Sequence, residues 1–178
     1  MLLACVIVTV LPSFAIAERF DVPEHGSLFL DVPSGWKSAL EASGMSLPPT
    51  IKFTPVNGDD FVMLITPLWS QKSDANFNSK EVIERKVKDE GIISLKQSVE
   101  TKLRLYEFKG EQAYGYYYKL TDKSLVGKKR TPGDYKQLLR SLVGVEDLLL
   151  SVTVLSHEAD SVHVDKAIKM IAGATKRK

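Results

Sequence analysis

Residues 147–156 read Asp-Leu-Leu-Leu-Ser-Val-Thr-Val-Leu-Ser, and they decide the fold of this 178-residue chain. Beyond the N-terminus, no other ten residues combine apolar and β-branched side chains so densely without Gly or Pro. Such a run is typical of a strand whose two faces are both largely covered. Residues 135–143 form a second candidate strand, and Gly144-Val145-Glu146 predicts the turn between the two. We therefore expect a hairpin in the middle of a sheet.

Shorter patterns on either side extend this sheet. Alternating apolar and polar residues predict strands over residues 26–32, 50–55, 61–66, 102–108 and 112–121. Residues 37–49 and 67–77 are rich in polar side chains, Gly or Pro, and we expect loops there.

Two helices are expected. The first begins at residue 78 or 79, with Asn78 as the N-cap and Glu81 three residues later in a capping-box spacing, and Gly91 is expected to kink or break it. The second runs from residue 160 or 161 to about residue 175, followed by a basic C-terminus that suits the end of a helix dipole. Short turns between strands and helices segregated in sequence predict an α+β fold with a mainly antiparallel sheet flanked by helices.

The first 17 residues carry no charged side chain and end in Ala15-Ile16-Ala17, the small-x-small pattern of a signal peptidase site. We expect a cleaved signal peptide over residues 1–17, too short to span a membrane as a helix of roughly 20 apolar residues, and one domain over residues 18–178. No Lys or Arg precedes the apolar run, so either the true start lies upstream of Met1 or the basic region is minimal. The expected location is the periplasm or the outside of the cell.

A lipoprotein is the alternative, because Leu2-Leu3-Ala4-Cys5 matches an acylation motif. That motif needs its apolar run before the cysteine, whereas here the run follows Cys5, which favours the cleaved signal peptide. Cys5 is the single cysteine, so a chain cleaved after Ala17 has no disulfide, thiol nucleophile or thiolate metal site.

The charge balance bears on the partner. The chain has 24 Lys and Arg against 22 Asp and Glu, and this near-neutrality argues against general nucleic-acid binding. After the predicted signal peptide, no segment is apolar for long enough to cross a bilayer. We expect a protein or an anionic envelope component as the partner.

Residues 30–36, Leu-Asp-Val-Pro-Ser-Gly-Trp, lead into the hairpin expected over residues 50–66. A helix near residues 79–98, a Gly-Tyr-Tyr-Tyr strand, the strand over residues 148–155 and a C-terminal helix follow. In this order the chain resembles the PsbP-like α/β/α sandwich family, which includes extrinsic photosystem proteins, exported bacterial proteins and Ran-binding transport proteins. The resemblance covers most of the mature chain. It implies the sandwich fold and a protein without enzymatic activity, and it supplies no site residues.

Residues 122–134 form the longest segment without a pattern. They carry the cations Lys123, Lys128, Lys129 and Arg130, with acids only at the two ends. Loops of this length in compact domains are usually functional or disordered. The loop predicts a site for an anionic partner such as a phosphate-bearing headgroup or an acidic protein; the alternative is a solvated loop that keeps the protein soluble.

A second candidate site lies at the start of the last helix, where His157, Glu158, Asp160 and His163 offer the nitrogen and carboxylate ligands that Zn²⁺ prefers. Six residues separate the two histidines, which fits neither one helix face nor one strand face, and acids at a helix start are also expected from capping. A divalent metal is the one cofactor that the sequence suggests.

No nucleophile-elbow, Walker, dinucleotide or zinc-protease motif is present. The sequence therefore predicts an exported, non-catalytic binding or accessory protein that acts through a surface. The alternative is a small periplasmic metal-dependent hydrolase using His157, His163 and nearby carboxylates.

Overall fold

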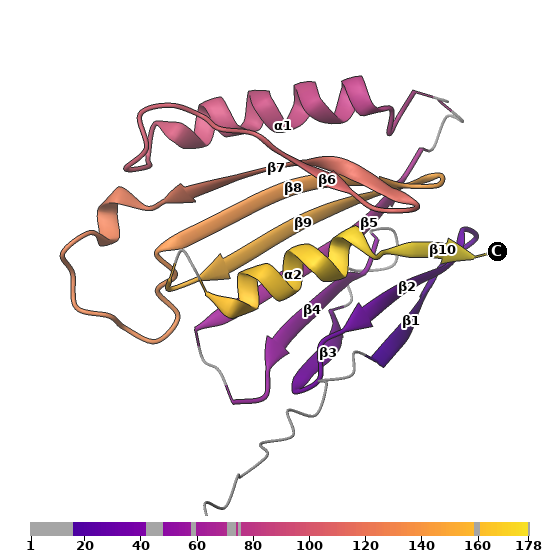
Figure 1. The fold of residues 1–178 in the computed structure, drawn as a ribbon, viewed down its shortest axis with the longest axis horizontal. Helices are drawn as coiled ribbons and strands as arrows, with labels where there is room; N and C mark the ends of the chain where they lie inside the picture. The colour runs from indigo at the N-terminus through magenta and orange to yellow at the C-terminus, as the bar shows by residue number, and fades with distance from the viewer. Residues whose placement is uncertain are drawn as a thin grey trace, which may run out of the picture.

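The computed structural model describes residues 16–41, 48–57, 60–70, 74, 76–158 and 161–177. They form a seven-stranded sheet in the order β3-β4-β5-β9-β8-β7-β6 and a three-stranded sheet in the order β1-β2-β10 (Figure 1). The strands of the larger sheet are β3 (Trp36–Glu41), β4 (Thr50–Pro55), β5 (Phe61–Trp69), β6 (Tyr106–Lys109), β7 (Ala113–Thr121), β8 (Gln137–Val145) and β9 (Leu148–Ser156). Those of the smaller sheet are β1 (Ile16–Val22), β2 (Gly26–Val32) and β10 (Thr175–Arg177). All the pairs are antiparallel, which confirms the predicted α+β class.

The predicted central hairpin is present as β8 and β9, with Val145 opposite Leu148 and Gln137 opposite Ser156. Its turn consists of Glu146 and Asp147, so the predicted Gly144-Val145-Glu146 turn is displaced by one to two residues. Glu146 has φ of 53°, the left-handed backbone that a two-residue hairpin turn favours. The shift lets β8 keep Val145, which is fully buried, in the sheet.

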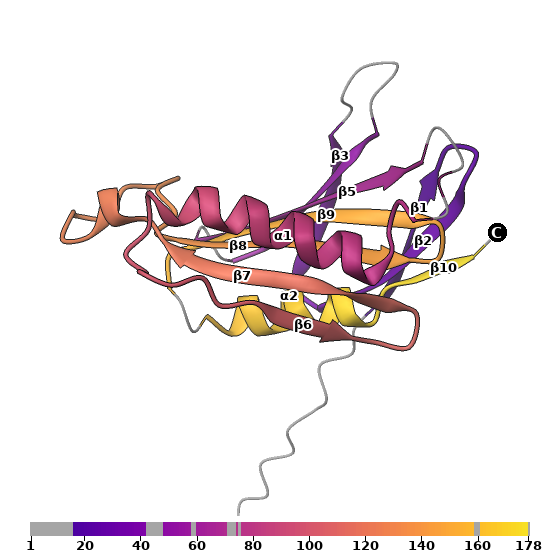
Figure 2. The same cartoon turned by 90° about the horizontal axis from the view of Figure 1, so that it is seen from above.

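The larger sheet is covered on both faces (Figure 2). One face carries α1 (Lys80–Leu95), whose buried residues Ile83, Val87 and Gly91 recur every four positions and pack over β7 and β8. The other face carries α2 (Val162–Ala172) together with the smaller sheet, and it holds the main core. These layers give the predicted α/β/α arrangement, because each helix and sheet must bury its apolar side against another element.

Helix α1 differs in two details from the sequence prediction. Its N-cap is Ser79, whose hydroxyl accepts from the Val82 N–H, while the Asn78 amide donates to the carbonyl oxygens of Glu146 and Leu148. Gly91 does not break the helix. A Cβ on Gly91 would lie 2.7 Å from Leu103 Cδ1 and 3.1 Å from Tyr118 Cδ1, so the glycine allows close packing at this point.

Two predicted loops are strands in part. Residues 36–41 form β3, an edge strand paired with β4. Strand β5 extends through Pro67 to Trp69, three residues beyond the prediction. Pro67 is tolerated because β4 pairs with β5 only at residues 63–65, which leaves one side of β5 unpaired at the proline.

The smaller sheet joins the two ends of the described chain. Strand β1 pairs with one side of β2 and β10 with the other, neither of which the sequence predicted. Helix α2 ends at Ala172, and the basic tail that was expected to follow it directly includes β10, in which Lys176 pairs with Leu28. Of the predicted signal peptide only Ile16 and Ala17 are described, as the first residues of β1. Among the described residues, no helix combines the length and apolarity that crossing a bilayer requires.

Candidate binding site

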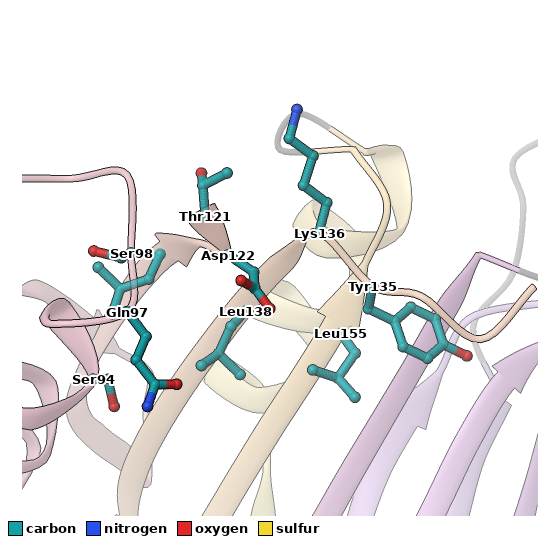
Figure 3. A pocket seen from close by; sticks show the side chains of 10 residues that line it. Ser94, Gln97, Ser98, Thr121, Asp122, Tyr135, Lys136, Leu138 and Leu155 are labelled. Carbon is teal, nitrogen blue, oxygen red and sulfur yellow. The ribbon is translucent and has the colours of Figure 1, made fainter. Parts of the chain in front are cut away.

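An apolar pocket of about 240 Å³ lies where α1 ends above the sheet (Figure 3). Its apolar wall comes from neighbouring strands and the segment before β8, and its polar wall comes mainly from the end of α1 and the end of β7. The lining residues are Leu120, Leu138, Leu155 and Tyr135, with Ser94, Gln97, Ser98, Thr121, Asp122 and Lys136. In Figure 3, Leu138 and Leu155 lie side by side, with Ser94, Gln97 and Ser98 on one side and Tyr135 on the other.

The pocket exists because the helix is shorter than the strands beneath it. Near the end of α1, the Ser94 hydroxyl is hydrogen-bonded to the Tyr118 hydroxyl of the sheet at 3.2 Å, and the helix ends at Leu95. Strands alternate their faces, so Leu120 is the next residue after Tyr118 on the α1 face of β7. The neighbouring Leu138 is partly exposed, because the helix does not reach it.

Two of the segments that line this pocket together carry an excess of basic residues. We call residues 94–100 and 119–136 the basic end; they contain seven Lys or Arg and three Asp or Glu. Two of the acids are engaged: Glu100 accepts from the N–H and hydroxyl of Thr121, and Asp122 accepts from the Ser124 N–H. Burial disfavours ionisation of Glu100, but the hydrogen bonds from Thr121 outweigh it and hold the pKa of this carboxyl below its usual value.

The four predicted anion-binding cations have different surroundings. Lys123 begins the short 3₁₀ helix η1 (Lys123–Leu125), and its Nζ donates to the Lys96 carbonyl at 2.6 Å. Arg130 forms an ion pair with Asp60 from the β4–β5 connection. Lys128 and Lys129 are exposed and make no ion pair within the described residues. Lys128 and Lys129 are thus the two cations of the predicted set whose side chains have no partner among the described residues.

The predicted metal ligands are not shown as a cluster. His157 Nδ1 lies 3.3 Å from the Asp134 carbonyl, and Glu158 is exposed. The half-buried His163 ring packs against the core residues Trp36 and Phe61, with ring centroids 5.9 and 5.5 Å away. The described ranges contain no group of three or more metal-ligating side chains, but Asp160 lies outside them. The metal site therefore remains a prediction.

His163 gives a pH-dependent prediction. Burial, and to a lesser degree Lys166, lowers the pKa of His163 below 6.5. The unfolded chain therefore binds the proton first, so the free energy of unfolding should fall as the pH drops below about 6.5 and level off below the folded-state pKa. His163→Phe should remove the part of this fall in the free energy of unfolding that comes from His163. Urea unfolding measured between pH 8 and pH 5 tests this. His157→Phe, at a partly exposed histidine outside the Trp36–Phe61 contact, is the control. Equal profiles for wild type and His163→Phe would contradict the assignment.

A second polar cluster joins the two sheets, and sequence reasoning did not find it. Asp147, in the β8–β9 turn, lies 3.0 Å from His25 Nδ1 and 2.7 Å from Lys176 Nζ. The His25 ring packs on Trp69 with centroids 5.0 Å apart. Residues 25, 147 and 176 are too far apart in sequence for any spacing rule to connect them.

The contacts of this cluster join the two sheets to each other. Burial opposes ionisation of Asp147, but hydrogen bonds from Lys176 and His25 outweigh it and lower the pKa of the carboxyl. A cavity of about 450 Å³ adjoins His25 and Asp147. Ser70 lines the same cavity, and its hydroxyl accepts from the Asp74 N–H. The cluster links β10 and the β1–β2 turn to the central hairpin.

The fold and its pocket allow comparison with known proteins. No model of a known protein family matches the chain, and no curated protein sequence does either. Among solved structures, the chain is similar to the solution structure of cyanobacterial PsbP (CyanoP) from Synechocystis sp. PCC 6803. The TM-score is 0.53 at 13% sequence identity, over 97% of this chain and 98% of that chain. The chain therefore has a PsbP-like fold, as the order of its elements predicted, and the likeness establishes the fold alone.

Proposed function

We propose that this protein is an exported, non-catalytic accessory protein that binds an anionic partner through its basic end. The observation that carries the proposal is an apolar pocket lined by two segments that hold seven basic and three acidic residues, with Arg130 paired to Asp60 outside them, in a chain whose net charge is only +2. A local positive field steers an anionic partner, while the pocket supplies apolar area for contact. The PsbP-like fold, whose family resemblance implies no enzymatic activity, supports a role without chemistry.

Neutralising the two accessible charges tests the proposal. Lys128→Ser with Lys129→Ser should reduce retention on immobilised polyglutamate or on phosphatidylglycerol vesicles at least threefold in about 0.1 M salt, where the Debye length is about 10 Å. Retention of the wild type should itself fall in about 1 M salt, where that length is about 3 Å. The thermal midpoint should change little, because exposed charges contribute little to stability.

Lys37→Ser with Lys88→Ser is the matched control, since it removes the same charge from exposed positions outside the basic end. Equal retention of the two double variants on both supports would reject the basic end as the binding surface.

Export has its own measurement. We expect the intact mass of the processed protein to correspond to a chain beginning at Glu18, with no lipid adduct. Cleavage there removes Ile16 and Ala17 from the outer end of β1 and leaves Glu18 still able to pair with Leu30. A mass showing an acylated Cys5 at the N-terminus would instead place the protein on a membrane surface.

A further inference from the structure

We propose that the pocket of the basic end is an anchor site for one bulky apolar side chain of an acidic protein segment. This inference rests on the proposed function, because it takes the basic end as the binding surface, and it adds what the partner must look like. Three features carry it: the size of the pocket, the depth of its apolar wall and the charges beside it.

The size of the pocket fits a single side chain. Its volume of about 240 Å³ is below the roughly 300–1,000 Å³ that is usual for small-molecule and cofactor sites. Protein interfaces instead depend on a few large anchors, most often aromatic, that fill small desolvated pockets. A Trp, Phe or Leu side chain of a partner has the right bulk for such a pocket.

The apolar wall is recessed. Leu120 is only 4% exposed, and Leu138 and Leu155 face each other across β8 and β9 and are half-buried. A side chain inserted between Gln97 and these leucines would lose most of its contact with water, which is the main source of an anchor's binding energy. The recessed position of these leucines suits an inserted side chain of a protein segment. The basic end also exposes Val99 and Val126, each 51% exposed, so vesicles are included in the test below.

The charges set the residues that flank the anchor. Lys136 lines the pocket, and in Figure 3 its amino group points away from Leu138 and Leu155, out of the apolar wall. Lys128 and Lys129 lie earlier in the chain, in the exposed loop that leads to Lys136. Carboxylates on the Lys136 side of the anchor complement these ammonium groups, whereas Lys or Arg there would be repelled. Asp122, which accepts from the Ser124 N–H, also lines the pocket and disfavours an acid directly beside it.

Two labelled peptides separate the anchor from the charge. Both are nine residues long and rich in Glu; one has a central Trp and the other a central Ser, and fluorescence anisotropy measures their binding to the processed protein. The Trp peptide should bind at least tenfold more tightly, equivalent to about 1.4 kcal/mol. Leu138→Ser with Leu155→Ser should abolish this difference, and Leu40→Ser, at an exposed leucine of β3, should preserve it.

A third variant covers the case in which the leucine substitutions disturb folding. Gln97 is exposed at the pocket wall, so Gln97→Trp places a bulky side chain at the pocket without changing the leucines. It should also abolish the tenfold preference for the Trp peptide.

The outcomes distinguish a failure of the anchor site from a failure of the basic end as the binding surface. If Lys128→Ser with Lys129→Ser weakens both peptides while the preference for Trp disappears in the pocket variants, the anchor site is established. If the charge variant weakens both peptides but wild type binds them equally, the proposed function stands and the anchor site is wrong. If phosphatidylglycerol vesicles bind and neither peptide does, the basic end is a membrane patch and the anchor site is again overturned.

Discussion

Gly115→Ala is expected to lower the free energy of unfolding by about 3 kcal/mol, at the upper end of what overpacking usually costs. A Cβ at this position would lie 2.2 Å from the Leu142 carbonyl oxygen and 2.8 Å from the Val143 Cα. Both atoms belong to the backbone of β8, which is held between β7 and β9 and has no room to yield. Urea unfolding with an unchanged slope would measure the loss as a shift of the midpoint.

Gly91→Ala is the matched control. Its Cβ would meet only side-chain atoms of Leu103 and Tyr118, which are able to shift, and alanine improves helix propensity by about 1 kcal/mol. We expect a net change within about 1 kcal/mol of zero. A loss for Gly115→Ala no larger than that for Gly91→Ala would contradict the close backbone approach between β7 and β8.

Asp147→Ala is expected to cost about 2 kcal/mol, because it leaves the ammonium of Lys176, whose side chain is 7% exposed, without its carboxylate. The loss is below the 3–5 kcal/mol of a fully buried pair, since the Asp147 side chain is 55% exposed. The folded-state pKa of Asp147 lies below 3.8, so its contribution is present above about pH 4 and lost as the pH falls further. Hydrogen exchange should show the loss first at β10 and β2.

Lys176→Met tests the cause of this loss. Methionine keeps the apolar stem and removes the charge, so Asp147→Ala combined with Lys176→Met should recover most of the stability. Asp89→Ala, at an exposed acid of α1, should change the free energy of unfolding by less than about 0.5 kcal/mol. If the double variant is as unstable as Asp147→Ala alone, the unpaired ammonium is not the reason for the loss.

The parts of the fold that were predictable are those with local signals. The apolar run of β9, the alternation in β4 and the four-residue spacing of Ile83 and Val87 in α1 each identify an element from a few neighbours. Strand β3 was not predicted because Trp36 is its only buried residue. Strand β10 was not predicted because three residues are too few to show a periodicity. Both depend on a partner strand, which no short window of sequence contains.

The candidate site divides in the same way. The excess of Lys and Arg in residues 122–134 was visible in the sequence, whereas the Arg130–Asp60 pair that removes one of these charges was not. The pocket was hidden because its leucines come from three strands and because it depends on where α1 ends relative to them. The sequence did contain one signal for the pocket: an apolar residue, Leu138, at the start of a strand that directly follows the basic loop.

The position of β10 has a consequence for how the chain is made. Thr175 pairs with Phe29, so the second strand of the smaller sheet leaves the ribosome long before the strand that covers its edge. At about 5–20 residues per second, that interval is on the order of 10–30 s. Throughout it, one side of β2 presents unpaired backbone N–H and C=O groups, an arrangement that other chains readily extend. A protease that trims the last few residues would make this transient exposure permanent.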